Sequence, residues 1–114
     1  MTSLQTTQPT QTTTGTITTT SGYRLPDMNS IHHALKLSIT EDKPIMMDYW
    51  TNSLDKTVLI GVKENGEKLL VRNNDEYTSP ISKIYKISNE YIIMTENSIY
   101  IVDIKIPTKR ISSD

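Results

Sequence analysis

Apolar and polar positions alternate most clearly in the stretch TVLIGVKENGEKLLVR, which runs from Thr57 to Arg72. Two apolar runs flank Asn65-Gly66, and this dipeptide between such runs is the strongest short-range signal for a β-hairpin. We expect a type I′ turn there, because Asn tolerates positive φ and Gly has no Cβ to oppose it. Gly61 lies on the outer face and marks a bulge or close packing. The alternation predicts an inner face made of Val58, Ile60, Val62, Leu69 and Val71.

Short apolar runs separated by polar turns continue on both sides of the hairpin and predict six strands in all. The expected strands are residues 45–50, 57–63, 67–73, 81–87, 91–95 and 99–106. Short turns make sequential strands antiparallel neighbours. The last two runs, YIIMT and IYIVDIKI, are apolar on both faces, whereas a sheet with one face in water alternates more cleanly. We therefore expect a sheet that curls on itself, is covered by a helix, or buries its second face on another chain.

One helix is expected ahead of the strands, over residues 28–40. Asp27 or Asn29 can cap its first turn. An apolar stripe of Ile31, Leu35 and Ile39 follows at i, i+4 and i+8, and such a stripe is suited to lying on a sheet.

The expected fold is mainly β: an antiparallel meander of five to six strands with one short N-terminal helix. It would close into a small SH3-like barrel or form a twisted sheet capped by the helix. Residues 1–26 form a Thr/Gln-rich tail, with eleven threonines in the first 22 positions, and we expect it to be disordered. The folded domain is expected at 27–108 and a polar C-terminal end at 109–114.

Composition narrows the functional classes. The net charge is −1, with twelve basic and thirteen acidic side chains, so no strongly basic nucleic-acid footprint is present. The chain has no cysteine, which removes disulfides and Cys-ligated zinc. No apolar run reaches the roughly 18 residues of a membrane span and the N-terminus lacks signal-peptide features, so we expect an intracellular protein and no membrane partner.

The candidate chemistry for catalysis is sparse. His32 and His33 are the only histidines, and adjacent residues on a helix do not readily ligate one metal. The acidic pairs Glu41-Asp42 and Asp75-Glu76 lie in expected turns with no base or nucleophile at a recognisable spacing. No glycine-rich phosphate loop is present. We expect a protein that is not an enzyme and that holds neither a metal nor another cofactor.

An aromatic set offers the clearest candidate binding site. Trp50, Tyr77 and Tyr85 could form a cage for methylated lysine, a platform for a proline-rich peptide or a stack for bases, and Asp75 could pair with a cation. The alternative is that these rings fill a core that has no Phe. Tyr77 is the most informative member, because it lies in a long polar connection where packing explains it least.

A basic set offers the alternative site, for nucleic acid. It consists of Lys63, Lys68, Arg72, Lys83 and Lys86. These residues could contact phosphates while the aromatic rings stack on bases. The interleaved Glu64 and Glu67 instead favour an ordinary solvated surface.

We therefore expect a non-catalytic interaction or assembly module that uses a sheet edge or apolar face to bind a protein partner or itself. The bias toward Ile, Lys, Asn and Tyr is typical of A+T-rich genomes, so one concrete form is a structural or accessory protein of a large DNA virus. A small-barrel nucleic-acid-binding protein is the alternative. No motif in the chain identifies a family.

Overall fold

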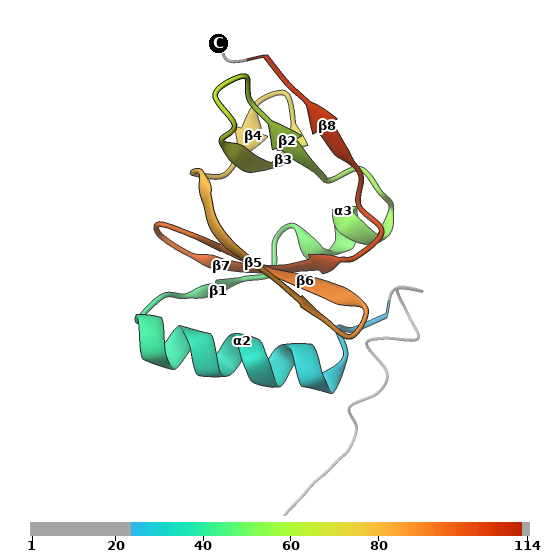
Figure 1. Cartoon of the computed structure of the whole chain (residues 1–114). Helices are drawn as coiled ribbons and strands as arrows, with labels where there is room; N and C mark the ends of the chain where they lie inside the picture. The colour runs from blue at the N-terminus through green and yellow to red at the C-terminus, as the bar shows by residue number, and fades with distance from the viewer. Residues whose placement is uncertain (1–23, 113–114) are drawn as a thin grey trace, which may run out of the picture.

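A computed structural model describes residues 24–112 of the chain. Over these residues the protein is mainly β and has three layers: a helix, a first sheet and a second sheet (Figure 1). Helix α2 (Met28–Glu41) covers one face of the first sheet, and the second sheet lies against the opposite face. Most of the tail expected at 1–26, and residues 113–114 of the expected C-terminal end, lie outside the described residues.

Within residues 24–112 each sheet has four strands. The first sheet has the order β1 (Ile45–Met46), β7 (Ile99–Asp103), β6 (Glu90–Thr95) and β5 (Ile81–Ile87). The second sheet has the order β4 (Glu76–Tyr77), β3 (Lys68–Asn73), β2 (Leu59–Val62) and β8 (Thr108–Arg110). Both sheets are mixed, because β1 runs parallel to β7 and β8 runs parallel to β2. A short helix, α3 (Trp50–Leu54), packs beside β7.

The mainly β class and the long helix are confirmed, but the described strands do not close into a barrel. The strand expected at 45–50 ends at Met46. A turn follows, in which the Trp50 N–H donates to the Met47 carbonyl oxygen at 3.1 Å, and Trp50 then begins α3. This turn buries Tyr49 between the two sheets and Trp50 on the α2 side of the first sheet. The two rings therefore pack in different hydrophobic clusters.

The central hairpin forms, but its turn has three residues instead of two. The Lys63 N–H donates to the Glu67 carbonyl oxygen at 2.8 Å, and the Gly66 N–H donates to the Lys63 carbonyl oxygen at 2.9 Å. Gly66 has a φ of 90°, whereas Asn65 does not have positive φ. This combination is a type I turn followed by a left-handed glycine, and not the type I′ turn that we expect from Asn-Gly.

The longer turn shifts the register of the hairpin by one residue. Ile60 pairs with Leu70, and Gly61 pairs with Leu69. Leu70 is fully buried in the core with Val58 and Ile60. The predicted inner face is therefore correct for Val58 and Ile60 but wrong for Leu69 and Val71, because a one-residue shift moves every side chain of a strand to the opposite face.

The doubly apolar strands β6 and β7 are covered on both faces within the chain. Between the sheets, Ile93 and Val102 pack with the hairpin core. On the other face, Ile92, Ile99 and Ile101 pack with residues of α2 and α3. Of the three explanations for two-sided apolarity, cover by a helix is correct for one face. The other face is covered by a second sheet of the same chain, which was not among the expected explanations.

Helix α2 begins and ends close to the predicted bounds, but it is rotated about its axis. Its buried residues are Ser30 and Ala34, whereas Leu35 is exposed and Ile39 is 80% exposed. The Ser30 hydroxyl donates to the Ile87 carbonyl oxygen at 3.0 Å and also contacts the buried carboxylate of Glu90. A buried carboxylate needs donors, and small side chains allow the helix to approach the sheet closely. The prediction that the Ile31, Leu35 and Ile39 stripe packs on the sheet is therefore wrong.

Candidate functional site

The aromatic candidates do not converge on one surface. Trp50 is 6% exposed, its indole N–H donates to the Arg24 carbonyl oxygen at 2.9 Å, and the Arg24 guanidinium lies 5.0 Å from the ring centroid. Tyr85 is half-buried and packs in the same core on the α2 side of the first sheet. Tyr77 instead lies on β4, in the second sheet, and is 61% exposed. Asp75 is in the β3–β4 turn, where its N–H donates to the Asn73 side chain at 2.8 Å.

The basic candidates are divided between the two sheets. Lys63 and Arg72 pair with carboxylates, at 3.5 Å from Glu67 and 3.7 Å from Glu76. Arg72 also donates to the Asn52 side chain at 3.0 Å. Lys68 is exposed at the start of β3, whereas Lys83 and Lys86 are exposed on β5 of the first sheet.

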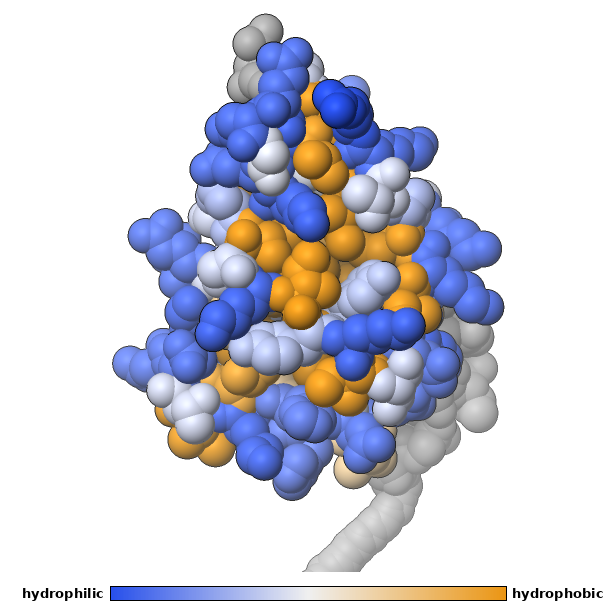
Figure 2. Space-filling view, in the orientation of Figure 1, coloured by the Kyte–Doolittle hydropathy of each residue, from blue (hydrophilic) through white to orange (hydrophobic). Residues whose placement is uncertain are grey.

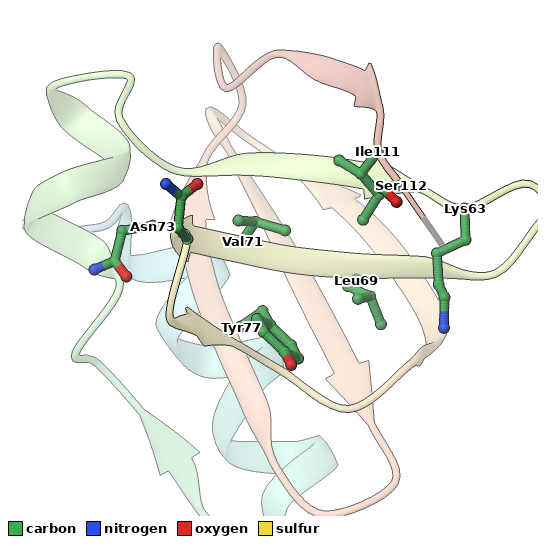
Figure 3. Close-up of a pocket in the computed structure, with 8 residues that line it drawn as sticks. Lys63, Leu69, Val71, Asn73, Tyr77, Ile111 and Ser112 are labelled. Atoms are coloured by element: carbon green, nitrogen blue, oxygen red, sulfur yellow. The ribbon is translucent and has the colours of Figure 1, made fainter. Parts of the chain in front are cut away.

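The second sheet carries a groove on the face that points away from the first sheet. We call it the outer groove, and its volume is about 380 Å³. It is lined by Lys63, Leu69, Val71, Asn73, Asn74, Tyr77, Ile111 and Ser112. Figure 3 shows Leu69 and Val71 side by side on β3, with Tyr77 and Ile111 on opposite sides of them.

Backbone register places each apolar side chain of the outer groove. Val71 pairs with Tyr77 across β3 and β4, so the two side chains share a face. Ile111 follows β8, and its N–H donates to the Val62 carbonyl oxygen at 3.0 Å. Its side chain lies over Gly61, where an added Cβ would be 2.7 Å from Ile111 Cδ1. The prediction of close packing at Gly61 is confirmed.

Most polar groups at the rim of the groove bond within the chain. The Lys63 ammonium contacts Glu67, while Asn73 donates to Glu76 at 2.8 Å and accepts from the Asp75 N–H. The lining therefore offers mainly an apolar floor and one exposed tyrosine ring. Such a surface binds apolar side chains by contact and exclusion of water.

A second cluster, formed by Arg24, Glu90 and Asp103, ties the segment before α2 to the first sheet. The Arg24 guanidinium contacts Glu90 and Asp103, each at 2.5 Å, and Glu90 is fully buried. Burial alone would lower the pKa of Arg24, but hydrogen bonds to the two carboxylates and their charges outweigh it, so the pKa is raised. A smaller hollow of about 310 Å³ lies beside this cluster.

The sequence reasoning missed both this cluster and the floor of the groove. Asp103 interrupts the apolar run IYIVDIKI, and an acidic residue inside a doubly apolar strand is a signal for a buried cationic partner. The alternation predicts Leu69 and Val71 on the inner face, and only the length of the turn would have placed them on the outer face of the second sheet.

Tyr49 and Tyr100 form the aromatic contact between the sheets. Their centroids are 5.3 Å apart, with an interplanar angle of 63°. Burial, more than any neighbouring charge, raises the pKa of Tyr49 from 10.0 to about 12. Burial also raises the pKa of Tyr100. Both phenols are therefore held in their neutral form well above neutral pH.

His32 and His33 are exposed on α2, and residues 24–112 contain no group of three or more His, Cys, Asp or Glu side chains placed to hold a metal ion. In the same range no helix is both long enough and apolar enough to cross a bilayer. Comparison of the chain with protein-family models, curated proteins and solved structures found no match.

Proposed function

We propose that this chain is a non-catalytic protein-interaction module that binds an extended, apolar segment of a partner protein in its outer groove. One observation carries the proposal: the hairpin register turns Leu69 and Val71 away from the core between the sheets and onto the floor of the outer groove, where Leu69 is 8% exposed, Val71 is half-buried and Tyr77 is 61% exposed. A monomeric protein gains nothing in stability from leaving such a ring in water. Open apolar surface with a polar rim is typical of protein interaction sites.

The lining of the groove favours a partner segment with uncharged, large apolar side chains. Lys63 is the only charged residue in the lining, and it lies 3.5 Å from Glu67, so little unpaired charge faces a ligand. The volume of about 380 Å³ falls at the lower end of the range for small-molecule pockets and suits a few side chains of a peptide. Tyr77 adds one hydroxyl at the edge, which can fix the orientation of a bound backbone.

The nucleic-acid alternative has less support in the geometry. Two of the five basic side chains proposed to contact phosphates are paired with carboxylates. Lys83 and Lys86 lie on β5 of the first sheet, apart from the others on the second sheet. Nucleic-acid binding and a role in a large DNA virus therefore stay predictions from residue types and composition alone.

The test is selection of peptides from a random displayed library against the full chain. We expect the selected peptides to share two or more large apolar residues. Their affinity should fall about tenfold or more with Val71→Lys, which places an ammonium on the floor, and with Tyr77→Ala. The affinity measurement is isothermal calorimetry on synthetic copies of the selected peptides.

The matched control is Ile39→Lys, which makes the same type of change at an exposed apolar residue of α2. It should leave peptide affinity within about twofold of the original. The proposal is overturned if no peptide is enriched, or if the enriched peptides bind the Val71→Lys protein as tightly as the unchanged chain.

A further inference from the structure

Strand β8 is held to the rest of the protein mainly by one edge of β2. It has three residues, Thr108–Arg110, and all three are exposed. Ile60 pairs with Thr108 and Val62 pairs with Arg110, and β2 is the one element that β8 contacts extensively within residues 24–112. Figure 2 shows hydrophilic side chains over the position that β8 has in Figure 1. The strand itself therefore adds little apolar burial to the fold.

Ile111, the residue that follows β8, is the apolar anchor of this segment. Its side chain lies over Gly61, where an added Cβ would be 2.7 Å from Ile111 Cδ1 and 3.1 Å from Val71 Cγ2. Ile111 and Val71 therefore meet over Gly61, and both line the outer groove (Figure 3). A glycine at this point of β2 leaves the room that the Ile111 side chain occupies.

The segment of residues 107–111, which we call the β8 strap, is held as a bound peptide would be. The Ile60 N–H donates to the Pro107 carbonyl oxygen at 2.9 Å, and the Ile111 N–H donates to the Val62 carbonyl oxygen at 3.0 Å. A peptide that adds to a sheet edge gains affinity from such main-chain bonds and specificity from pockets for its side chains. The outer groove therefore already contains one large apolar side chain of an extended segment, supplied by the chain itself.

We propose that the β8 strap is an internal ligand of the outer groove, and that a partner segment binds by displacing it from β2 and placing its own apolar side chain over Gly61. This inference rests on the proposed function, because it states how a partner enters the same groove. It narrows the partner to a segment that can pair as a β-strand and that carries a branched apolar residue, Ile or Val, in the position of Ile111.

Release of the β8 strap uncovers little apolar surface. Local opening requires the least free energy where few apolar contacts are buried and the backbone hydrogen bonds lie close to solvent. The three side chains of β8 are exposed, and Ile111 is only half-buried. In the described part of the chain no strand pairs with the outer edge of β8. A partner strand would restore the hydrogen bonds that β2 loses, so the exchange is suited to a reversible interaction.

The strap predicts an unusual effect of removing an apolar side chain from the groove. A ligand that binds only the open form has its affinity reduced by the open fraction, so a strap that is open in about one tenth of the molecules weakens binding about tenfold. Ile111→Ala removes the anchor and should raise the affinity of a selected peptide by about threefold to tenfold. If Ile111 were only a wall of the groove, the same change would remove a contact and lower the affinity.

Calorimetry on the full chain, with the peptides selected against it, measures this effect. The matched control is Arg110→Ala, because alternation along the strand places this exposed side chain on the face opposite Ile111. It should leave the affinity within about twofold of the original.

Amide hydrogen exchange of the unchanged chain, followed by NMR, gives a second measurement that needs no variant. Without peptide, the amides of Ile60 and Ile111 should exchange about tenfold or more faster than that of Ile93, which lies in the centre of the first sheet. At saturating peptide the Ile111 amide loses the Val62 carbonyl and should exchange faster still, whereas the Ile60 amide gains a partner from the peptide and should slow. A fixed wall would slow at both amides.

The strap is refuted if Ile111→Ala lowers peptide affinity, if the Ile111 amide slows when peptide binds, or if it exchanges as slowly as Ile93 in the free chain. Peptides that bind the unchanged chain and depend on Val71 would then still support the proposed function. Failure to enrich any peptide overturns the proposed function and the strap together, so the two failures are distinct.

Discussion

The Arg24 cluster allows a quantitative test of what holds the N-terminal end of the domain. Arg24→Leu removes a guanidinium that makes two contacts of 2.5 Å, to Glu90 and Asp103. Glu90 is fully buried, and within residues 24–112 it keeps the Ser30 hydroxyl and the Asp27 N–H, which donates at 3.3 Å. The variant therefore leaves a buried negative charge without its cation.

The expected loss in the free energy of unfolding follows from how deeply Arg24 and Glu90 are each buried. Breaking a fully buried ion pair costs about 3–5 kcal/mol. The Arg24 side chain is 40% exposed, which reduces this, while loss of its contact with the Trp50 ring adds a fraction of a kcal/mol. We expect Arg24→Leu to lower the free energy of unfolding by about 3 kcal/mol, or the melting temperature by about 12–24 °C.

The assay is urea unfolding followed by circular dichroism at pH 7. The double variant Arg24→Leu with Glu90→Gln should recover part of the loss, because the neutral amide removes the buried charge that Arg24 compensates. Lys63→Leu, which breaks an exposed pair, should cost less than about 1 kcal/mol. If Arg24→Leu costs no more than this control, the cluster does not act as a buried ion pair.

Two further predictions concern the core between the sheets and the packing at Gly61. The raised pKa of Tyr49 means that stability is complete below pH 10 and is lost as pH rises toward 12, by roughly 2–3 kcal/mol. Tyr49→Phe should remove most of this loss in urea unfolding at pH 8, 10 and 11, and an equally steep alkaline loss in the variant would contradict the assignment. Gly61→Ala should destabilise by about 1 kcal/mol, because the new Cβ would lie 2.7 Å from Ile111 Cδ1. In an Ile111→Ala background the same change should cost less, because alanine is better than glycine in a strand and the Val71 Cγ2 contact at 3.1 Å is the one that remains; an unchanged cost there would refute the role given to Ile111.

Local patterns in the sequence predict local elements well. Strand β5 has the predicted bounds, and α2 and β6 are within one residue of theirs. The failures occur where two local solutions look the same in sequence. Asn65-Gly66 satisfies both a two-residue turn and a three-residue turn with a left-handed glycine, and only the second turns Leu69 and Val71 to the outer face of the second sheet.

The remaining failures come from contacts between distant residues. The apolar stripe of α2 predicted the wrong buried face. The buried carboxylate of Glu90 accepts a hydrogen bond from Ser30, and the helix is rotated so that Ser30 faces the sheet. β8 is a strand because it pairs in parallel with β2, which is distant from it in the sequence. No alternation of apolar and polar residues marks it as a strand. Of the candidate site, Tyr77 stood out in the sequence as the aromatic residue that packing explains least, and it is 61% exposed. Ile111 instead reaches the groove through the position of β8, which periodicity does not predict.

The parallel pairs have a consequence for when each sheet is finished during synthesis. Ile45 pairs with Ile99, and Ile60 pairs with Thr108, so β1 and the edge of β2 that faces away from β3 both wait for the last strands. The antiparallel β5–β6–β7 meander can form early from neighbouring residues, but β1 has no partner until β7 exists. A nascent chain that ends before residue 99 exposes apolar strand surface, and cellular chaperones would have most to protect at that stage.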